Sequence, residues 1–312
     1  MRITQASFEI LPRDEKRGGM SIIELAGRTC YKSAPGLSST SAENFVRRLA
    51  GSGHLSVMEH GDMIFDVTDA KIGQYLEDSL RSMRYVGKPA PMLTHTCIGG
   101  RHLVSGNMRA WMELFKSADL VSRYFIGHFD PAYTEGCYDA DAQPDNRVRQ
   151  LRYIDLDDPA ERRAHIRQTV RFVVDRGVSH EFVRHRVMSF SQESTRYCNY
   201  AKDKFGHEIA VIEPLYLVHG TDAYGAWRTA CEEAERQYFA MLDLGCLPEE
   251  ARAVLPTSTR TELIMTGTLG QWDHFFDLRA RQVTGKAHPQ AAEVAVPLMR
   301  ETARRYPDVI RG

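Results

Sequence analysis

The chain has 312 residues, of which 43% are hydrophobic and 26% are charged, and its formal net charge at pH 7 is -1. This balance is typical of a globular protein that buries a substantial core in one large domain or two small ones. Because the chain is almost neutral, it has no overall attraction for nucleic acid or for an anionic membrane, and any preference for polyanions must be local.

Neither the N-terminal residues nor any later span is apolar enough for a leader or a membrane helix, which predicts a cytoplasmic protein without membrane contact. The six cysteines form no C-x-x-C pair and no regular framework, which predicts reduced and mostly buried thiols. We also expect no structural metal, because His180-Glu181 is followed by Arg184 where a zinc motif needs its second ligand.

The first third of the chain predicts both strands and helices. Apolar periodicity places a strand at residues 2–10, helices at 20–31 and 40–49, and a strand at 63–67. The second helix is expected to open with the capping box Thr40-x-x-Glu43. Gly51-Ser-Gly53-His-Leu-Ser56 approaches a dinucleotide-binding fingerprint. It follows a helix and has Ser56 in place of the third glycine, so we reject that interpretation.

The middle of the chain predicts three helices and one polar loop. Helical patterns cover residues 71–84, 105–116 and 158–176, and the last has Asp158 as its cap and Pro159 at its first position. An acidic stretch at residues 130–145 contains no Lys or Arg and is expected to be a solvated loop.

Two apolar segments are similar to each other. Residues 104–115 and 265–276 share a Ser/Thr-Gly-polar start, the same apolar spacing and a tryptophan at the same position. Two amphipathic helices with similar starts can arise by chance or local convergence, which we favour over a true repeat.

The most unusual stretch runs from His180 to Tyr200 and is rich in cationic and hydroxyl side chains. It has too few apolar residues for a continuous buried face, whereas guanidinium groups that converge with hydroxyl donors would suit a phosphate or a pyrophosphate. A solvated polar loop is the alternative. In a strand, Arg184 and Arg186 would face one way and His185 the other, so this segment could reach two ligands.

The last third predicts a strand at 208–212 and helices at 222–244 and from Thr268, and the second of these helices carries His274 and Arg279. Between them lies Ala251-Arg252-Ala-Val-Leu-Pro256. Taken alone, Arg252 could be a helix-terminal arginine near the final carbonyl groups.

Arg184-His185-Arg186, followed after seven residues by Ser194-x-Arg196-Tyr197, resembles the defining motif of the flavin-dependent thymidylate synthases, the ThyX family. Glu59-His60 and the Ala-Arg-x-x-Leu-Pro segment resemble two further blocks of that family. The resemblance covers most of the chain outside about residues 70–155. It implies an α+β fold with a mixed, mainly antiparallel sheet flanked by helical segments, in a single domain of residues 1–312 with an insertion at about 70–155.

The resemblance also implies a set of binding residues. Those for dUMP are Glu181, Arg184, Gln192, Glu193, Ser194, Thr195, Arg196 and Arg252. Those for FAD are His60, Asp62, Arg184, His185, Arg186, Gln192, Thr268 and His274. Glu181 stands where some members carry Gln, and the acid at Asp62 departs from a small residue in the family. Thr268 and Gly270 replace an Asn-x-Arg of the family, so the earlier Asn107-x-Arg109 is a further candidate for flavin contact.

The implied activity is reductive methylation of dUMP to dTMP, with 5,10-methylenetetrahydrofolate as one-carbon donor and NADPH as reductant through tightly bound FAD. Arg279 would be catalytic, because a guanidinium fixed against the N3 edge of uracil stabilises the negative charge that makes the 5-carbon nucleophilic. No cysteine follows a proline, so the proline-cysteine nucleophile of conventional thymidylate synthase is absent. The family also implies a homotetramer with active sites at subunit interfaces, acting on small molecules rather than nucleic acid.

Two other functions stay open. A nucleic-acid-binding protein could place the arginine-rich stretch on a phosphate backbone, although this predicts a wider basic patch with aromatic residues. A flavin enzyme could instead install a different one-carbon group on dUMP, because the folate and NADPH sites have no recognisable local motif.

Overall fold

The fold was analysed in a computed structural model that describes residues 1–13, 16–33, 39–85, 93–116 and 121–312. The strands are β1 (Arg2–Thr4), β2 (Ser7–Ile10), β3 (Asp62–Val67), β4 (Leu93–Ile98), β5 (Arg101–Asn107), β6 (Val148–Leu151), β7 (Arg167–Asp175), β8 (Ser189–Gln192), β9 (Ala210–Ile212) and β10 (Arg260–Thr268). The longer helices are α1 (Met20–Tyr31), α2 (Ser39–Ser52), α3 (Ala70–Tyr85), α4 (Met108–Lys116), α9 (Asp222–Asp243), α11 (Leu269–Arg279) and α12 (Pro289–Arg305). The shorter ones are α5 (Ser122–Phe125), α6 (Pro131–Thr134), α7 (Pro159–His165), α8 (Arg176–Phe182) and α10 (Pro248–Ala251).

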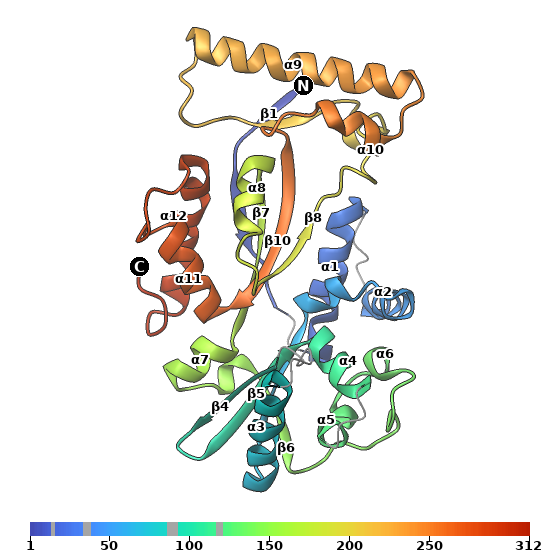
Figure 1. Cartoon of the computed structure of the whole chain (residues 1–312), viewed down its shortest axis with the longest axis vertical. Coiled ribbons are helices and arrows are strands. Elements are labelled where there is room, and N and C mark those ends of the chain that lie inside the picture. Colours follow the sequence, from blue (N-terminus) through green and yellow to red (C-terminus); the bar gives the residue numbers. More distant parts are fainter. Residues whose placement is uncertain (14–15, 34–38, 86–92, 117–120) are drawn as a thin grey trace.

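The fold class is α+β, with two four-stranded antiparallel sheets and one parallel pair, β1-β9. The first large sheet has the order β2-β7-β10-β8 and lies in the middle of the molecule, with α9 across one end of it (Figure 1). Side chains alternate between its faces, so Leu263 and Met265 pack in the core with α11 and α12, while Ile264 packs with Ile22 and Ala26 of α1.

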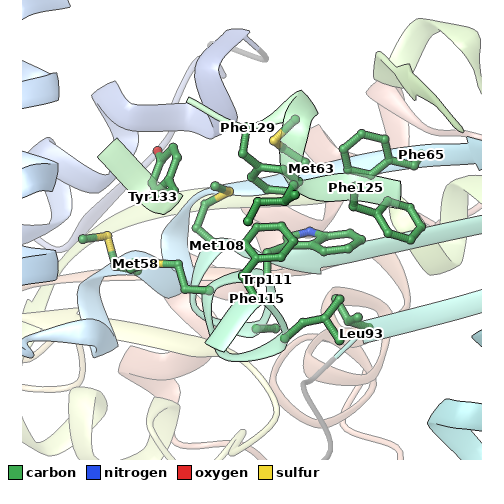
Figure 2. Close-up of a cluster of buried hydrophobic side chains, with 14 of the residues drawn as sticks. Met58, Met63, Phe65, Leu93, Met108, Trp111, Phe115, Phe125, Phe129 and Tyr133 are labelled. Carbon is green, nitrogen blue, oxygen red and sulfur yellow. The ribbon is translucent and has the colours of Figure 1, made fainter. Parts of the chain in front are cut away.

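The second large sheet has the order β4-β5-β3-β6 and lies at the opposite end from α9 (Figure 1). One of its faces packs on an aromatic cluster, in which Phe65 meets Trp111 and Phe125 edge to face at 5.3 Å each (Figure 2). From the other face, Ile64 and Leu103 join the core of the first sheet. Sheet β4-β5-β3-β6 therefore separates two cores, and residues from within the expected insertion are integral to both.

The two large sheets contain units with the same order of elements. β3, α3, β4, β5 and α4 follow one another in the first unit, and β7, α8, β8, β10 and α11 do so in the second, with β9, α9 and α10 added between β8 and β10. The strands also have matching neighbours, since β5 lies between β4 and β3 just as β10 lies between β8 and β7. The two similar segments of the sequence, 104–115 and 265–276, form the same strand-to-helix corner of these units.

Individual side chains match between the units as well. Asn107 Oδ1 accepts a hydrogen bond from Ala110 N at 2.8 Å at the start of α4, and Thr268 Oγ1 accepts one from Gln271 N at 3.2 Å at the start of α11. The residue before each cap is a glycine. A Cβ atom would lie 2.2 Å from the Leu93 side chain at Gly106 and 2.6 Å from that of Met188 at Gly267. Such correspondence favours an internal repeat over the chance similarity expected from the sequence.

A histidine before the first strand of each unit reaches into the other unit. His60 Nδ1 lies 2.8 Å from Thr266 Oγ1 of β10, and its Nε2 lies 3.0 Å from Ser191 Oγ of β8. His165 Nδ1 lies 2.8 Å from Ser105 Oγ of β5, and its Nε2 lies 2.7 Å from Thr96 Oγ1 of β4. Each histidine thus forms hydrogen bonds to two strands of the other unit, and these contacts join the two units.

Several predicted elements are confirmed, and others are wrong. The helices at 20–31 and 222–244 correspond to α1 and α9, and the strand at 63–67 to β3. The expected helix at 158–176 is wrong beyond α7, because residues 167–175 form β7. Val170, Phe172 and Val174 alternate along the core face of this strand, and this alternation, together with its β-branched residues, was the usable signal.

Smaller corrections concern the ends of elements. The helix expected at 105–116 begins at Met108, since the preceding residues extend β5. Helix α2 begins at Ser39, so Thr40 lies inside it and is not its cap. The acidic stretch at 130–145 contains the short helix α6, followed by turns.

Candidate active site

The Arg-His-Arg motif lies in a turn between α8 and β8 and not in a strand. Asp175 begins α8 by accepting a hydrogen bond from Val178 N at 2.7 Å, and the helix ends at Phe182. Arg184 and Arg186 are exposed, and His185 is buried. The side chains therefore point in opposite directions as expected, but the turn is responsible rather than strand alternation.

Arg279 at the end of α11 is held by this motif. Its Nε donates to His185 Nε2 at 3.3 Å, its Nη2 donates to the Glu181 carbonyl at 3.0 Å, and its Nη1 pairs with the Glu181 carboxylate. Burial lowers the pKa of His185 to about 4, with smaller contributions from the charges of Arg279 and His274. His185 is therefore neutral at pH 7 and can accept this hydrogen bond, which fixes the guanidinium.

His274 lies beside this group and is exposed, with its ring centroid 6.1 Å from that of His185. The structure thus brings together five of the predicted site residues at the start of β8. They are Glu181, Arg184, His185, His274 and Arg279, and Arg186 follows them in the same turn.

A pocket of about 540 Å³ lies at the opposite end of β8. Gln192 and Ser194 line it from the motif side, and the α1 residues Cys30 and Tyr31 line it from the other. Ser194 is fixed there because its N–H donates to the Cys30 carbonyl at 3.0 Å. Gln192 Nε2 donates to Ser179 Oγ at 2.9 Å, which holds its amide at the edge of the sheet.

Arg109 from the first turn of α4 also lines this pocket. It forms ion pairs with Glu59 at 2.9 Å and Glu113 at 2.8 Å, which keep its guanidinium at the rim. Asn107, by contrast, is buried and caps α4, so it is committed to the helix start. Of the two residues proposed from the Asn-x-Arg, the structure places only the arginine at the pocket.

Three more of the predicted nucleotide contacts meet near this end of β8. Arg252 Nη1 donates to Thr195 Oγ1 at 3.3 Å, and Arg196 pairs with Glu249 of α10 at 3.3 Å. Both arginines are exposed. The Ser-x-Arg-Tyr segment and the Ala-Arg-x-x-Leu-Pro segment, which are far apart in the sequence, thus form one cationic surface.

Glu193 is an exception among the predicted nucleotide contacts. Its buried carboxylate faces a different pocket of about 390 Å³, where it accepts a hydrogen bond from Tyr200 Oη at 3.1 Å and lies 3.4 Å from Lys32 Nζ and 3.8 Å from Arg260 Nη1. Because side chains alternate at the end of β8, Glu193 points away from Gln192 and Ser194. The Glu193 side chain therefore does not line the 540 Å³ pocket, and its contact with dUMP stays a prediction.

The predicted flavin contacts His60 and Asp62 are also placed elsewhere. His60 is 0% exposed and both ring nitrogens have protein partners. The Asp62 carboxylate pairs with Arg13 and accepts a hydrogen bond from Tyr153 Oη at 3.0 Å. Thr268 is buried as the cap of α11. These three residues support the fold, and none of them lines the pocket.

The sequence interpretation missed several residues that line the 540 Å³ pocket. They are His54, Ser56, Tyr31 and Tyr197, and the rings of the two tyrosines lie 5.0 Å apart. The available signal was Gly51-Ser-Gly53-His-Leu-Ser56, which we rejected because it does not fit a dinucleotide fold. In the part of the chain that the structure describes, no group of three or more His, Cys, Asp or Glu side chains is arranged to hold a metal ion.

Most of the chain matches the model of a known family. The family model of the thymidylate synthase complementing protein matches residues 14–76 and 140–308, and the unmatched residues 77–139 fall inside the expected insertion. The chain is 31% identical over 127 residues to the flavin-dependent thymidylate synthase of Pyrococcus abyssi, which is 41% of this chain and 50% of that protein. It is 30% identical over 138 residues to that of Geobacter sulfurreducens, or 44% and 56% of the two chains.

The chain spans about half the length of the curated relatives it matches. Among solved structures, the UMP/dUMP methylase PolB from Streptomyces cacaoi, bound with 5-Br dUMP, is similar at 16% identity and a TM-score of 0.41, covering 97% of this chain and 93% of that one. Since the family model accounts for more than half of its residues, the chain belongs to the thymidylate synthase complementing protein family.

Proposed function

We propose that this protein is a flavin-dependent thymidylate synthase. It converts dUMP to dTMP with 5,10-methylenetetrahydrofolate as one-carbon donor, and NADPH supplies the reducing equivalents through FAD. The observation that carries the proposal is the 540 Å³ pocket, where Gln192 and Ser194 of the motif segment meet Arg109 from a distant helix. Its volume is that of a typical small-molecule or cofactor site.

The residues of this pocket suit a flavin. Tyr31 and Tyr197 offer aromatic faces for a planar ring, and Arg109 offers a cation for a phosphate group. Ser194 offers a hydroxyl donor, and Gln192 offers its Oε1 as an acceptor, because its Nε2 already donates to Ser179 and Thr261. When bound, FAD supplies the hydride chemistry that no side chain can perform. We assign Gln192 and Arg109 to FAD, together with His54 and Ser56 in place of His60 and Asp62.

The cationic surface beside the pocket suits the phosphate and sugar of dUMP. Arg252 and Arg196 are exposed and are oriented by Thr195 and Glu249, so they are available to a dianion. Arg184 at the other end of β8 is exposed as well and is free to reach a ligand bound against a second chain.

Arg279 performs the activation step in this proposal. Its fixed guanidinium faces the N3 edge of the uracil ring and stabilises the negative charge that develops there. Glu181 and His185 keep the side chain in one conformation, so little reorganisation is needed when charge develops.

A cysteine nucleophile is not required for this chemistry. Cys30 lines the candidate pocket, and burial raises the pKa of its thiol. Because the thiolate is the reactive form, this environment makes Cys30 a poor nucleophile at neutral pH.

A complete active site requires a second copy of the chain. Arg279 and the pocket lie at opposite ends of β8, whose four residues span about 13 Å. Arg279 and the pocket would meet if each active site combined the Arg-His-Arg end of β8 from one subunit with the pocket of another subunit. We therefore propose a homotetramer with shared sites, acting in the cytoplasm on small molecules and not on nucleic acid.

The proposal is tested by an anaerobic visible spectrum of the protein with FAD, to which NADPH is added with and without dUMP. Flavin bleaching that dUMP accelerates is the expected result. Arg109→Ala should weaken FAD binding, whereas Arg47→Ala should not, because Arg47 forms a similar ion pair with Glu43 but does not line the pocket. A spectrum of free flavin that ignores dUMP would contradict the proposal.

A further inference from the structure

A third pocket, of about 440 Å³, shares no lining residue with the 540 Å³ pocket of the candidate active site. The segment after β2, the turn at Tyr153–Asp155, the start of β7 and the end of α12 form its walls. Four arginines line it, at positions 13, 162, 167 and 305, and no Asp or Glu is among its described lining residues.

Three of these arginines have carboxylate partners. Arg13 pairs with Asp62, Arg162 with Asp308 at 2.7 Å, and Arg305 with Glu301 at 2.5 Å. These side chains are neutralised by the protein, so they contribute hydrogen-bond donors more than net charge.

Arg167 differs from the other three. It is only 7% exposed, and its Nε, like that of Arg13, is buried without a hydrogen-bond partner. Among the residues that the structure describes, no carboxylate forms an ion pair with its guanidinium. Its backbone N–H donates to Tyr153 Oη at 3.0 Å, which fixes the start of the side chain at the pocket wall.

A buried guanidinium nitrogen without a partner is unfavourable in a folded protein, because it has lost water and gained no compensating acceptor, and here no carboxylate of the described residues balances the charge. Such a group is expected to have a partner that comes from outside the chain. We propose that this pocket binds the phosphate or carboxylate of a small aromatic ligand, and that Arg167 is its principal anion contact.

The remaining walls indicate the rest of the ligand. Leu11, Ile166 and the ring of Tyr306 are apolar surfaces, and the Arg13 guanidinium lies 4.6 Å from the centre of the Tyr153 ring. Ile154 stands at the rim with 76% of its surface exposed. A planar heteroaromatic body could be covered by these groups while its anionic group meets Arg167.

Under the proposed function, two co-substrates have this chemistry: NADPH, with phosphates, and the folate, with carboxylates. The identity of the ligand rests on that function, but the anion site does not. The test therefore measures binding of NADPH, 5-formyltetrahydrofolate and inorganic phosphate to the FAD-loaded protein by calorimetry and by the shift in Tm.

The informative variant is Arg167→Met, with Arg171→Met as its matched control on the same strand. Arg171 pairs with Glu9 and does not line the pocket. We expect Arg167→Met to weaken binding of one of the two organic anions by about 10-fold to 100-fold, the usual effect of removing a charged hydrogen-bond partner. The control should bind like the unchanged protein.

The unliganded variant gives a second readout. If Arg167 serves a ligand, removing its unpaired charge should leave Tm unchanged or raise it, whereas a structural arginine would lower Tm when lost. Arg167→Lys keeps the charge but not the planar fork and should bind with intermediate affinity, which provides a test if the methionine variant does not fold.

Equal affinity in Arg167→Met and the control would overturn the proposal, as would failure of all three probes to bind. Whichever organic anion binds, NADPH or the folate, is identified as the ligand of the site. Binding of inorganic phosphate alone, at millimolar concentration, would mean an adventitious ion only and would also overturn the proposal. If dUMP did not accelerate flavin bleaching in the unchanged protein but anion binding still depended on Arg167, the proposed function would be rejected and this anion site would stand.

Discussion

Arg279 donates from all three of its guanidinium nitrogens to Glu181 and His185. We predict that Arg279→Lys lowers the rate of dTMP formation by about 10²-fold to 10³-fold, because lysine cannot keep the planar contacts that aim the charge at uracil. Arg281→Lys is the control, since Arg281 lies two residues beyond the end of α11 and forms its ion pairs with Asp273 and Asp277 of that helix. Turnover by Arg279→Lys at the rate of the unchanged enzyme would remove Arg279 from the mechanism.

His60 is expected to make the free energy of unfolding depend on pH. Burial lowers its pKa to about 3, below the ordinary value of 6.5. Between these two values the unfolded chain binds a proton that the folded chain does not, so the free energy of unfolding falls as pH decreases. His60→Gln should reduce this slope by about 0.7 kcal/mol between pH 7 and 6 and by about 1.2 kcal/mol between pH 6 and 5, as measured by urea unfolding at pH 7, 6 and 5.

The same variant should be less stable at pH 7 by about 1–3 kcal/mol, because the Thr266 and Ser191 hydroxyls lose a well-placed partner. His207→Gln, at an exposed position, serves as the control. An unchanged pH slope in His60→Gln would show that this histidine does not link protonation to folding.

Among the elements, α4 and α11 begin in the same way, with a polar cap after a buried strand. We predict that Asn107→Ala and Thr268→Ala each cost about 1 kcal/mol of stability in urea unfolding, and that Asn107→Asp retains most of it. Asn107→Ala should leave FAD affinity unchanged, because its side chain is committed to Ala110 N. Loss of FAD binding at unchanged stability would instead make Asn107 a flavin contact.

For the whole molecule, the separation of Arg279 from the pocket predicts complementation between impaired variants. Arg279→Lys and Arg252→Ala should each be strongly impaired alone, and co-expression should restore much of the turnover, because some shared sites then receive both unchanged ends. Arg279→Lys with His185→Ala should not recover, since both changes affect the same end of β8. A monomer by light scattering that still turned over would refute the shared-site arrangement.

The internal repeat belongs to this scale too. Reciprocal contacts of His60 and His165 join the two units in one chain. Only one of the two strand-to-helix corners carries a pocket-lining arginine, Arg109. At the equivalent Gly270, a Cβ atom would already lie 3.2 Å from the Arg163 carbonyl oxygen, so the corresponding corner is filled by protein. Within the described residues, the repeat has thus kept the pocket arginine at one corner only.

The sequence by itself determined the family and the motif residues, because the spacing of Arg184-His185-Arg186 and Ser194-x-Arg196 is local and needs no fold to be recognised. It also determined elements with strong local signals, such as α1, α9 and the Thr268 cap of α11. Strand β7 was missed because the Asp158 cap indicates where a helix begins and not where it ends, although Val170, Phe172 and Val174 alternate as strand residues beyond α7.

Only the tertiary structure decided which of these residues share a site. His60 and Asp62 are residue types that often contact ligands, but here they are buried against partners from distant parts of the chain. Glu193 points into a separate pocket because side chains alternate at the end of β8. His54, Ser56 and Arg109 reach the candidate pocket only because α1, α4 and β8 pack around it. Such contacts join residues that are far apart in the chain, 206 positions for His60 and Thr266 and 91 for Asp62 and Tyr153, and local sequence patterns contain no information about such pairings.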